Sequence, residues 1–314
     1  MSSKKTLALV ALAASAGLVL AGCSNSDPTA DPDASSPAAS GDSSAIIVGS
    51  AGFAESEIIG EIYAGALEAN GITVERRFQI GARDIYLGAL EDGSVDLLPD
   101  YSGNLLQFYD AETTAVTPEE IIEALPAALP EGFEVLDAAE AENKDSYNVT
   151  REFSEENGVT SLADLADLGI PLVVGGNPEL AERPYGPQGL TEVYGVDASL
   201  VSFVPISDGG GAQTTSALLD GTVTLADIYS TTPSIAENDF VTLEDPENLI
   251  LAQNVIPIIN SDKATDEVVS ILNEVSAALT TEDLIELNTL NQGADKVAPA
   301  KVAADWLAEN GFTS

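Results

Sequence analysis

A segment of fifteen residues occurs twice in this chain, 128 positions apart, and this repeat limits the possible folds more than any other feature. Residues 89–103 read Ala-Leu-Glu-Asp-Gly-Ser-Val-Asp-Leu-Leu-Pro-Asp-Tyr-Ser-Gly, and residues 217–231 match them at 8 of 15 positions. Each copy is typical of a helix end, an Asp-Gly turn, a buried strand and a tyrosine where the strand stops. Asp-Gly turns are common, but the coincident tyrosines, Tyr101 and Tyr229, predict two similar lobes with one tyrosine each at a crevice.

The hydrophobic pattern from residue 45 onward indicates an α/β fold. Short apolar runs alternate with helix patterns, as at 55–70, where Ile58, Ile62 and Ala66 form one stripe and Gly71 follows as a stop. This alternation predicts a largely parallel sheet, which binds ligands beyond the carboxyl ends of its strands. The expected strands are 46–49, 74–80, 95–98, 134–136, 147–150, 171–174, 202–206, 223–227, 240–243 and 255–259.

The composition excludes several classes of protein. The 314 residues include 52 acidic and only 11 basic ones, and the formal charge of -41 argues against a nucleic-acid partner, which requires a basic face. The chain has no histidine, which removes imidazole catalysis and His-ligated zinc sites. Its single cysteine excludes an intramolecular disulfide framework and a thiolate cluster. We therefore expect no enzyme, no cofactor and no metal site.

The first 22 residues have the layout of a secretory signal, because two lysines precede an apolar run at 7–20 that is too short for a comfortable membrane span. The run ends in Leu-Ala-Gly-Cys, which resembles the lipobox of bacterial lipoproteins, so Cys23 is the expected lipidation site. The alternative is a plain signal peptide followed by an inert cysteine. Residues 23–44 are rich in Ser, Ala, Asp and Pro and are expected to form a disordered tether.

Four segments between residues 46 and 262 resemble, in unbroken order, the motifs of one known family. Residues 49–56, Gly-Ser-Ala-Gly-Phe-Ala-Glu-Ser, are similar to Gly-Ser-Lys-x-Phe-Thr-Glu-Gln. Asp-Tyr-Ser-Gly-Asn at 100–104 resembles Glu-Tyr-Thr-Gly-Thr. The stretch 173–184 resembles Gly-x-x-x-Glu-Phe-x-x-Arg-Pro, and 223–230 resembles Ala-Asp-Ala-Tyr-Ser-Thr. By these motifs the chain resembles the substrate-binding proteins of ABC importers for quaternary ammonium osmoprotectants.

The resemblance implies the type II periplasmic-binding-protein clamp, an α/β fold of two lobes joined by two crossovers. Lobe 1 would comprise residues 45–145 and 251–314, and lobe 2 residues 146–250. The resemblance further implies a monomeric receptor, lipid-anchored at the outer face of the cell membrane, that delivers its ligand to an ABC permease and its ATPase. The expected ligand is a quaternary ammonium compatible solute such as glycine betaine, choline or carnitine.

A trimethylammonium group has no N–H to donate, so aromatic faces must hold it. The resemblance places this cage on Tyr101, Tyr147 and Tyr229, and it matches Arg183 to the arginine that binds a ligand carboxylate through its planar fork. From the residues alone, Arg183 also fits the role of a surface residue that forms a salt bridge with a neighbouring glutamate. Tyr86 and Tyr185 are expected in the core or at the rim, and Tyr185 is also an alternative cage residue because it follows Arg183 closely.

Three positions depart from the family pattern. Ala51 replaces a lysine, Asn104 replaces a threonine, and Gln253 stands where a fourth cage tyrosine is expected. These changes favour a larger or more polar ligand, such as carnitine, whose hydroxyl could bind to Asn104 and Gln253. Phe53 and Asp100 complete the candidate ligand-binding residues, although Phe53 also fits a hydrophobic staple at a helix entry.

Two other functions stay open. The chain could be a receptor for a different small zwitterion or an amino acid, because an ammonium with protons would favour a carboxylate acceptor such as Asp100 over a full cage. An extracellular hydrolase with Asp100 and Asp227 as paired carboxylates is a remote alternative. The number of aromatic side chains in the crevice distinguishes the first possibility from the quaternary ammonium receptor.

Overall fold

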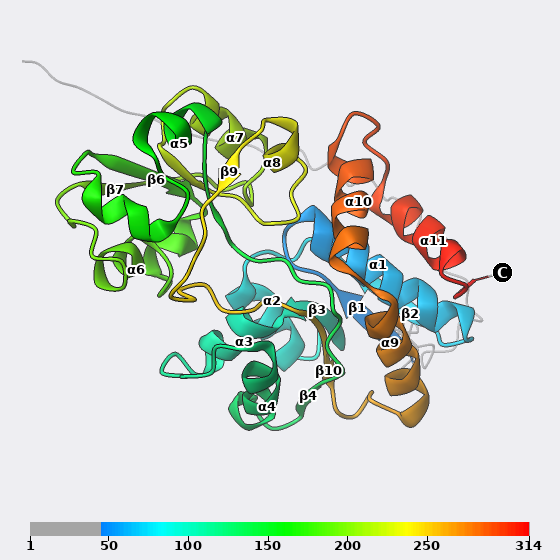
Figure 1. Cartoon of the computed structure of the whole chain (residues 1–314). Coiled ribbons are helices and arrows are strands. Elements are labelled where there is room, and N and C mark those ends of the chain that lie inside the picture. Colours follow the sequence, from blue (N-terminus) through cyan, green and yellow to red (C-terminus); the bar gives the residue numbers. More distant parts are fainter. Residues whose placement is uncertain (1–44, 314) are drawn as a thin grey trace, which may run out of the picture. The chain divides into compact units, whose positions relative to one another are not determined.

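The computed structural model describes residues 45–313, which form two α/β lobes, each built on a five-stranded sheet (Figure 1). Cys23 and the expected signal and tether segments lie outside the described residues. In each sheet four strands run in the same direction. The fourth strand in the order across the sheet runs antiparallel to its two neighbours. Within residues 45–313 no helix is both long enough and apolar enough to cross a membrane.

Lobe 1 contains the sheet with strand order β2-β1-β3-β10-β4. β10 runs antiparallel to its neighbours because the chain returns from lobe 2 at the carboxyl edge of β3, where Val255 pairs with Tyr101. The prediction of a largely parallel sheet therefore holds for four strands of lobe 1, and β10 is the exception. The elements of lobe 1 are β1 (Ile46–Gly49), α1 (Ala54–Ala69), β2 (Val74–Arg77), α2 (Arg83–Glu91), β3 (Leu97–Tyr101), α3 (Ser102–Tyr109), α4 (Pro118–Ala128), β4 (Phe133–Val135), β10 (Val255–Asn260), α9 (Asp266–Ala278), α10 (Thr281–Gln292) and α11 (Pro299–Glu309).

Lobe 2 repeats this plan in the order β7-β6-β8-β5-β9. Here β5 is the antiparallel strand, because the chain enters at the carboxyl edge of β8, where Tyr147 pairs with Asp227. The elements of lobe 2 are β5 (Tyr147–Val149), α5 (Arg151–Asn157), the 3-10 helix η1 (Leu162–Asp167), β6 (Leu172–Gly176), the 3-10 helix η2 (Pro178–Glu182), α6 (Pro187–Glu192), β7 (Val201–Pro205), α7 (Ala212–Leu219), β8 (Leu225–Asp227), α8 (Ser234–Glu237) and β9 (Val241–Thr242).

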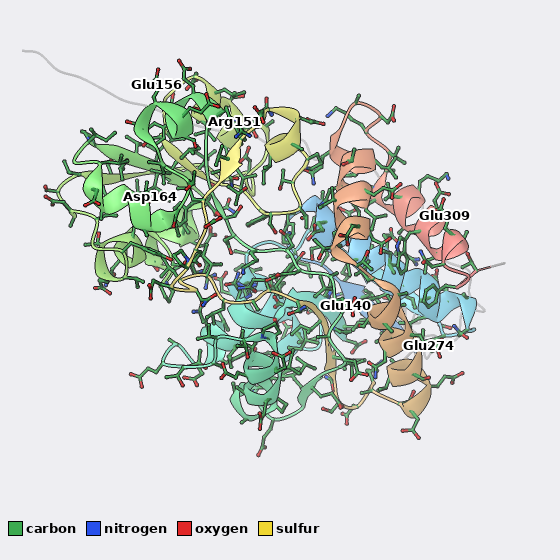
Figure 2. The ribbon with its side chains drawn as sticks, viewed as in Figure 1. Glu140, Arg151, Glu156, Asp164, Glu274 and Glu309 are labelled. Atoms are coloured by element: carbon green, nitrogen blue, oxygen red, sulfur yellow. The ribbon has the colours of Figure 1, made fainter. Side chains whose placement is uncertain are left out.

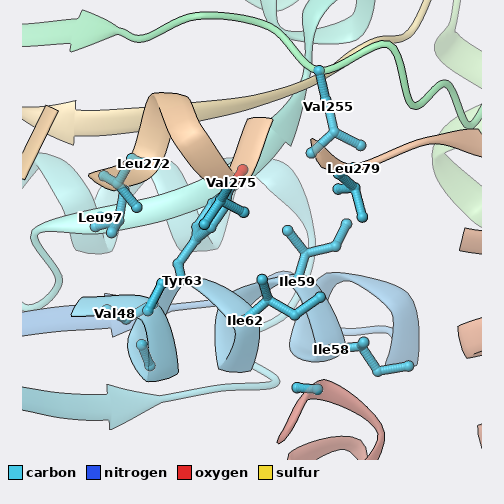
Figure 3. Close-up of a cluster of buried hydrophobic side chains, with 14 of the residues drawn as sticks. Val48, Ile58, Ile59, Ile62, Tyr63, Leu97, Val255, Leu272, Val275 and Leu279 are labelled. Atoms are coloured by element: carbon cyan, nitrogen blue, oxygen red, sulfur yellow. The ribbon is translucent and has the colours of Figure 1, made fainter. Parts of the chain in front are cut away.

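Helix α1 follows the stripe predicted from its sequence. Ile58, Ile62 and Ala66 are fully buried, and Gly71 ends the segment in the left-handed region at φ +84. Figure 3 shows Ile58 and Ile62 in a cluster with Val48 of the sheet and Leu272 of α9. A separate core cluster gathers the apolar side chains of α2, α3 and α4. These two clusters hold the strand ends of lobe 1 in place.

The sequence repeat is also a structural repeat. Both Asp-Gly turns put their glycine in the left-handed region, at φ +74 and +77. The strand that follows is tied to its neighbour by the same bond in each lobe: Asp96 Oδ2 accepts from Ile47 N at 2.9 Å, and Thr224 Oγ1 accepts from Val173 N at 2.6 Å. The two tyrosines therefore reach equivalent positions at the ends of β3 and β8.

Two crossover segments connect the lobes, one between β4 and β5 and the other between β9 and β10. They lie side by side, because Asn143 N donates to Gln253 O at 3.1 Å and Glu142 forms an isolated antiparallel bridge with Asn254. A paired connection of this kind restricts relative motion of two lobes to bending across the pair.

Candidate functional site

A cavity of about 650 Å³ lies where the carboxyl ends of β1, β3, β6 and β8 converge. Its wall combines the segment 51–55 after β1, Tyr101 at the end of β3, Asn177 after β6 and Tyr229 after β8. Both lobes supply side chains, so a ligand in the cavity would contact both. This position follows the rule that open α/β sheets bind ligands beyond the carboxyl ends of their strands.

Three aromatic rings form a continuous array in the cavity wall. The Phe53 ring lies 6.0 Å from the Tyr101 ring, with 29° between the ring planes. On its other side it lies 5.6 Å from the Tyr229 ring at 57°. Phe53 is the N-cap of α1, and Tyr101 and Tyr229 are the two repeat tyrosines. Phe53 thus links the tyrosine of lobe 1 with that of lobe 2.

Hydrogen bonds fix the orientation of both tyrosine rings. Tyr101 Oη donates to Glu55 Oε1 at 2.6 Å, and Asn177 Nδ2 donates to Tyr229 Oη at 3.0 Å. Burial raises the pKa of the Tyr101 hydroxyl well above its usual value, and the Glu55 carboxylate raises it further. Both rings are therefore neutral and held in place before a ligand arrives.

Glu55 accepts four hydrogen bonds although its side chain is almost completely buried. Besides Tyr101, Asn143 Nδ2 donates to Oε1 at 2.7 Å. Thr231 Oγ1 and Asn288 Nδ2 donate to Oε2 at 2.5 and 2.6 Å. The donors come from β3, a crossover, lobe 2 and α10, so one carboxylate joins four separate segments beside the cavity.

Five of the eight candidate ligand-binding residues lie in the cavity wall. Arg183 is half-buried there and forms no ion pair with any residue in 45–313, so the alternative of a surface salt bridge is wrong. Asn104 Nδ2 donates at 3.1 Å to Oδ2 of Asp145, which lies at the end of the first crossover. The five residues are Phe53, Tyr101, Asn104, Arg183 and Tyr229.

Tyr147 and Gln253 do not line the cavity, contrary to the prediction. Tyr147 lies in β5 and points into the core of lobe 2, where its hydroxyl donates to Tyr185 O at 2.8 Å. Gln253 is fully buried in the second crossover, and its Oε1 accepts from Asn104 N at 3.0 Å. Gln253 therefore holds the first turn of α3 rather than facing a ligand.

Asp100 also lies behind the wall, where it is fully buried. It accepts from Arg83 Nη2 at 2.9 Å, from Tyr86 Oη at 3.0 Å and from Tyr101 N at 2.7 Å. Because Asp100 is committed to these three donors, it does not face Asp227 across the cavity. The paired-carboxylate arrangement that a hydrolase would need is absent from these two residues.

Three further side chains line the cavity: Arg83 and Tyr86, which the sequence reasoning did not place there, and Tyr185, which it gave only as an alternative. Both tyrosines are nearly fully buried and pack in the core of their lobes, as expected, and each also contributes to the cavity wall. Arg83 begins α2, two residues after Gly81. The scarcity of basic residues was the one sequence feature that could have pointed to Arg83, because a buried arginine in so acidic a chain needs a specific partner.

Asp145 and Asp227 form a neighbouring pair of carboxyl groups in the wall. Burial raises the pKa of Asp227 well above its usual value, and the Asp145 carboxylate next to it raises it further. The pair also acts on Tyr229, whose pKa rises through burial and then through both carboxylates. This part of the wall therefore favours a positive charge.

Most other acidic side chains belong to the surface, as Glu156, Glu274 and Glu309 illustrate (Figure 2). Among the described residues, no group of three or more His, Cys, Asp or Glu side chains could hold a metal ion. The distinctive chemistry of the described chain therefore lies in the cavity, where aromatic faces stand beside groups of both charges.

Two lobes on equivalent sheets, paired crossovers and a cavity between the strand ends define a solute-binding protein of the clamp type. The chain belongs to the family of substrate binding domains of ABC-type glycine betaine transport systems, which it matches over residues 44–309. Members of this family are extracytoplasmic solute receptors that work with a permease and an ATPase. The predicted family and the two-lobed clamp are thereby confirmed.

Individual relatives agree with this assignment. The glycine betaine-binding protein YehZ of Escherichia coli is 26% identical over 281 residues, which cover 86% of this chain and 92% of YehZ. The chemotactic signal transduction system substrate-binding protein CosB of Halobacterium salinarum is 27% identical over 286 residues, covering 85% of this chain and 84% of CosB. The crystal structure of a glycine betaine/carnitine/choline ABC transporter protein shares the fold, with a TM-score of 0.69 at 21% identity over 85% of this chain and 99% of that one.

Proposed function

We propose that this chain binds a quaternary ammonium compatible solute, such as glycine betaine, choline or carnitine, and delivers it to an ABC permease. One observation carries the proposal: a chain of this family has a cavity between its lobes, walled by the adjacent rings of Phe53, Tyr101 and Tyr229. The cavity is large enough for a small solute and draws on both lobes.

The aromatic rings fit the chemistry of a trimethylammonium group. The faces of aromatic rings attract the diffuse cation and cover its methyl groups, each contact contributing about 0.5–2 kcal/mol. With Tyr86 and Tyr185, five aromatic side chains line the wall. These two tyrosines supply the aromatic surface that was expected at positions 147 and 253. Several such contacts together account for binding in the micromolar range.

Closure of the lobes follows from where the cage residues lie. Phe53 and Tyr101 belong to lobe 1 and Tyr229 to lobe 2, so a ligand held by all three favours the closed form. In the proposal lobe 1 comprises residues 45–145 and 251–314, and lobe 2 residues 146–250. The closed form presents both lobes to the permease.

The proposal includes the expected membrane attachment. A lipid on Cys23 would hold a monomeric receptor at the outer face of the membrane, with residues 24–44 as a spacer. The Leu-Ala-Gly-Cys sequence supports this part of the proposal. The receptor has no catalytic role in this account. Metabolic labelling with a radioactive fatty acid would test it, because a Cys23→Ser variant should lose the label.

Calorimetric titration of the chain tests the ligand class. We expect saturable binding of glycine betaine, choline, carnitine or proline betaine, and a loss of about tenfold or more in Tyr229→Leu. Tyr109→Leu is the control, because Tyr109 is a half-buried tyrosine outside the cavity wall. The absence of binding for all four ligands would refute the proposal.

A receptor for an amino acid or another small zwitterion is the second candidate. Asp145 and Asp227 favour it, since their carboxyl groups could accept N–H bonds from a primary ammonium. The same titration with a panel of amino acids separates the candidates: binding of an amino acid but of no quaternary ammonium would select the second.

A further inference from the structure

Arg83 occupies a part of the cavity wall to which the family resemblance assigns no role. It is the first residue of α2, and its side chain is only 10% exposed. Nη2 donates to Asp100 Oδ1 at 2.9 Å, and Cζ lies 5.9 Å from the centroid of the Tyr86 ring. Asp100 and Tyr86 thus hold the guanidinium from behind.

The guanidinium of Arg83 is incompletely satisfied in this position. Its Nη2 donates to Asp100, whereas Nη1 makes no hydrogen bond within residues 45–313 and, unlike the unpartnered Nε, is not fully buried. An arginine carries five N–H donors in a rigid planar fork and remains charged. Because the side chain lines the cavity, Nη1 can donate to a ligand acceptor there.

Arg183 lines the same cavity from lobe 2 and has no ion pair within the described chain. Both arginines act on Tyr185. Its pKa is raised well above the usual value, first by burial and then by Asp145, while Arg183 and Arg83 oppose the rise. Two arginines from opposite lobes therefore line the same cavity as Tyr185.

The same cavity wall carries the carboxyl groups of Asp145 and Asp227. After burial, these two groups raise the pKa of Tyr229, and Arg83 lowers it. The cavity accordingly has carboxyl and guanidinium groups in one wall. A ligand with both charges complements this arrangement better than a simple cation.

We propose that Arg83 is a ligand-binding residue, which donates hydrogen bonds to the carboxylate of a zwitterionic ligand and, with Arg183, favours carboxylated betaines over choline. The inference rests on the proposed function. Asp100 neutralises much of the Arg83 charge, so the guanidinium contributes directed N–H donors rather than a strong field. Contact with Arg83 in lobe 1 and Arg183 in lobe 2 lets one carboxylate bridge the lobes.

Glycine betaine and choline provide a matched pair of probes, since both carry trimethylammonium and only glycine betaine carries a carboxylate. Titration of the full chain should show tighter binding of glycine betaine. In Arg83→Lys, which keeps the charge next to Asp100 but removes the fork, glycine betaine affinity should fall about 10- to 100-fold. Choline affinity should change less than about threefold. Arg76→Lys is the matched control, because Arg76 is paired with Glu61 and Glu68 outside the cavity.

A second variant distinguishes a loss of ligand binding from a folding defect. Arg83→Met combined with Asp100→Asn removes both charges of the buried pair, and it should show the same selective loss of glycine betaine. An equal loss for both ligands in both variants, or unchanged glycine betaine affinity in Arg83→Lys, would overturn the role of Arg83 and leave the proposed function intact. If neither ligand binds the unsubstituted chain, the proposed function and this inference fall together.

Discussion

Thr231 of lobe 2 donates its hydroxyl hydrogen to Glu55 of lobe 1, with 2.5 Å between Oγ1 and Oε2. This bond crosses between the lobes directly beside the cavity, where both residues form part of the wall. Glu55 also orients Tyr101 through the bond to its hydroxyl. A single carboxylate therefore connects the position of a cage ring to the contact between the lobes, which makes ligand binding and closure sensitive to the same group.

Glu55→Gln tests this connection. An amide offers one acceptor oxygen and two donors, so at least two of the four present bonds to Glu55 would be lost. Each bond to a charged group contributes about 1.5–3 kcal/mol, and we expect the free energy of unfolding to fall by at least that amount. Urea denaturation measures it, with the exposed Glu140→Gln as control. Equal stability of the two variants would contradict the role of Glu55.

Tyr101→Phe separates the ring from its hydroxyl. The variant keeps the aromatic face toward Phe53 and removes only the bond to Glu55. We expect quaternary ammonium affinity to fall less than about fivefold, whereas Tyr101→Leu should lose about tenfold or more because the cation–ring attraction disappears. Calorimetric titration gives both values. A larger loss in Tyr101→Phe than in Tyr101→Leu would assign the effect to the hydroxyl instead.

Asp227 should make stability depend on pH. Its pKa in the folded chain is raised by burial and by Asp145, so the folded state binds the proton more tightly than the unfolded state. The contribution of this proton to the free energy of unfolding is fully present below about pH 4. It is lost as the pH rises through the raised pKa of Asp227. Asp227→Asn should therefore gain stability relative to the original chain as the pH increases above about 4. Urea unfolding at several pH values measures the difference, and parallel curves would refute it.

Two helical glycines should respond in opposite ways to alanine. A Cβ on Gly103 would lie 2.5 Å from Ala252 O and 2.8 Å from Leu251 Cβ, so Gly103→Ala pushes α3 against a crossover and should cost about 1–3 kcal/mol. A Cβ on Gly88 in α2 meets nothing within 4 Å, and Gly88→Ala should stabilise the fold by about 0.5–1 kcal/mol. Thermal unfolding compares the two, and a stabilised Gly103→Ala would show that this contact is not tight.

The fold class could be predicted well from local patterns. The alternating apolar runs indicated all ten strands found within residues 45–313, the stripe of Ile58 and Ile62 indicated α1, and the Asp-Gly repeat indicated two equivalent lobes. These features depend on residues close in sequence, because turn chemistry and hydrophobic periodicity act within a few positions. The direction of β5 and β10 escaped prediction, since it depends on where the chain re-enters each sheet.

Tyr101, Tyr229 and Phe53 could be predicted in the cavity wall because each lies at a strand end or within a few residues of one. Asn104 and Arg183 were predicted through the family resemblance. Tyr147 begins a strand in the same region but points into the core of lobe 2, and Asp100 turns away from the cavity toward Arg83. The packing of distant segments decides which side chain of a strand end lines the cavity and which charged side chain is paired behind the cavity wall. The physical reason is that burial and charge pairing require groups that lie far apart in the sequence.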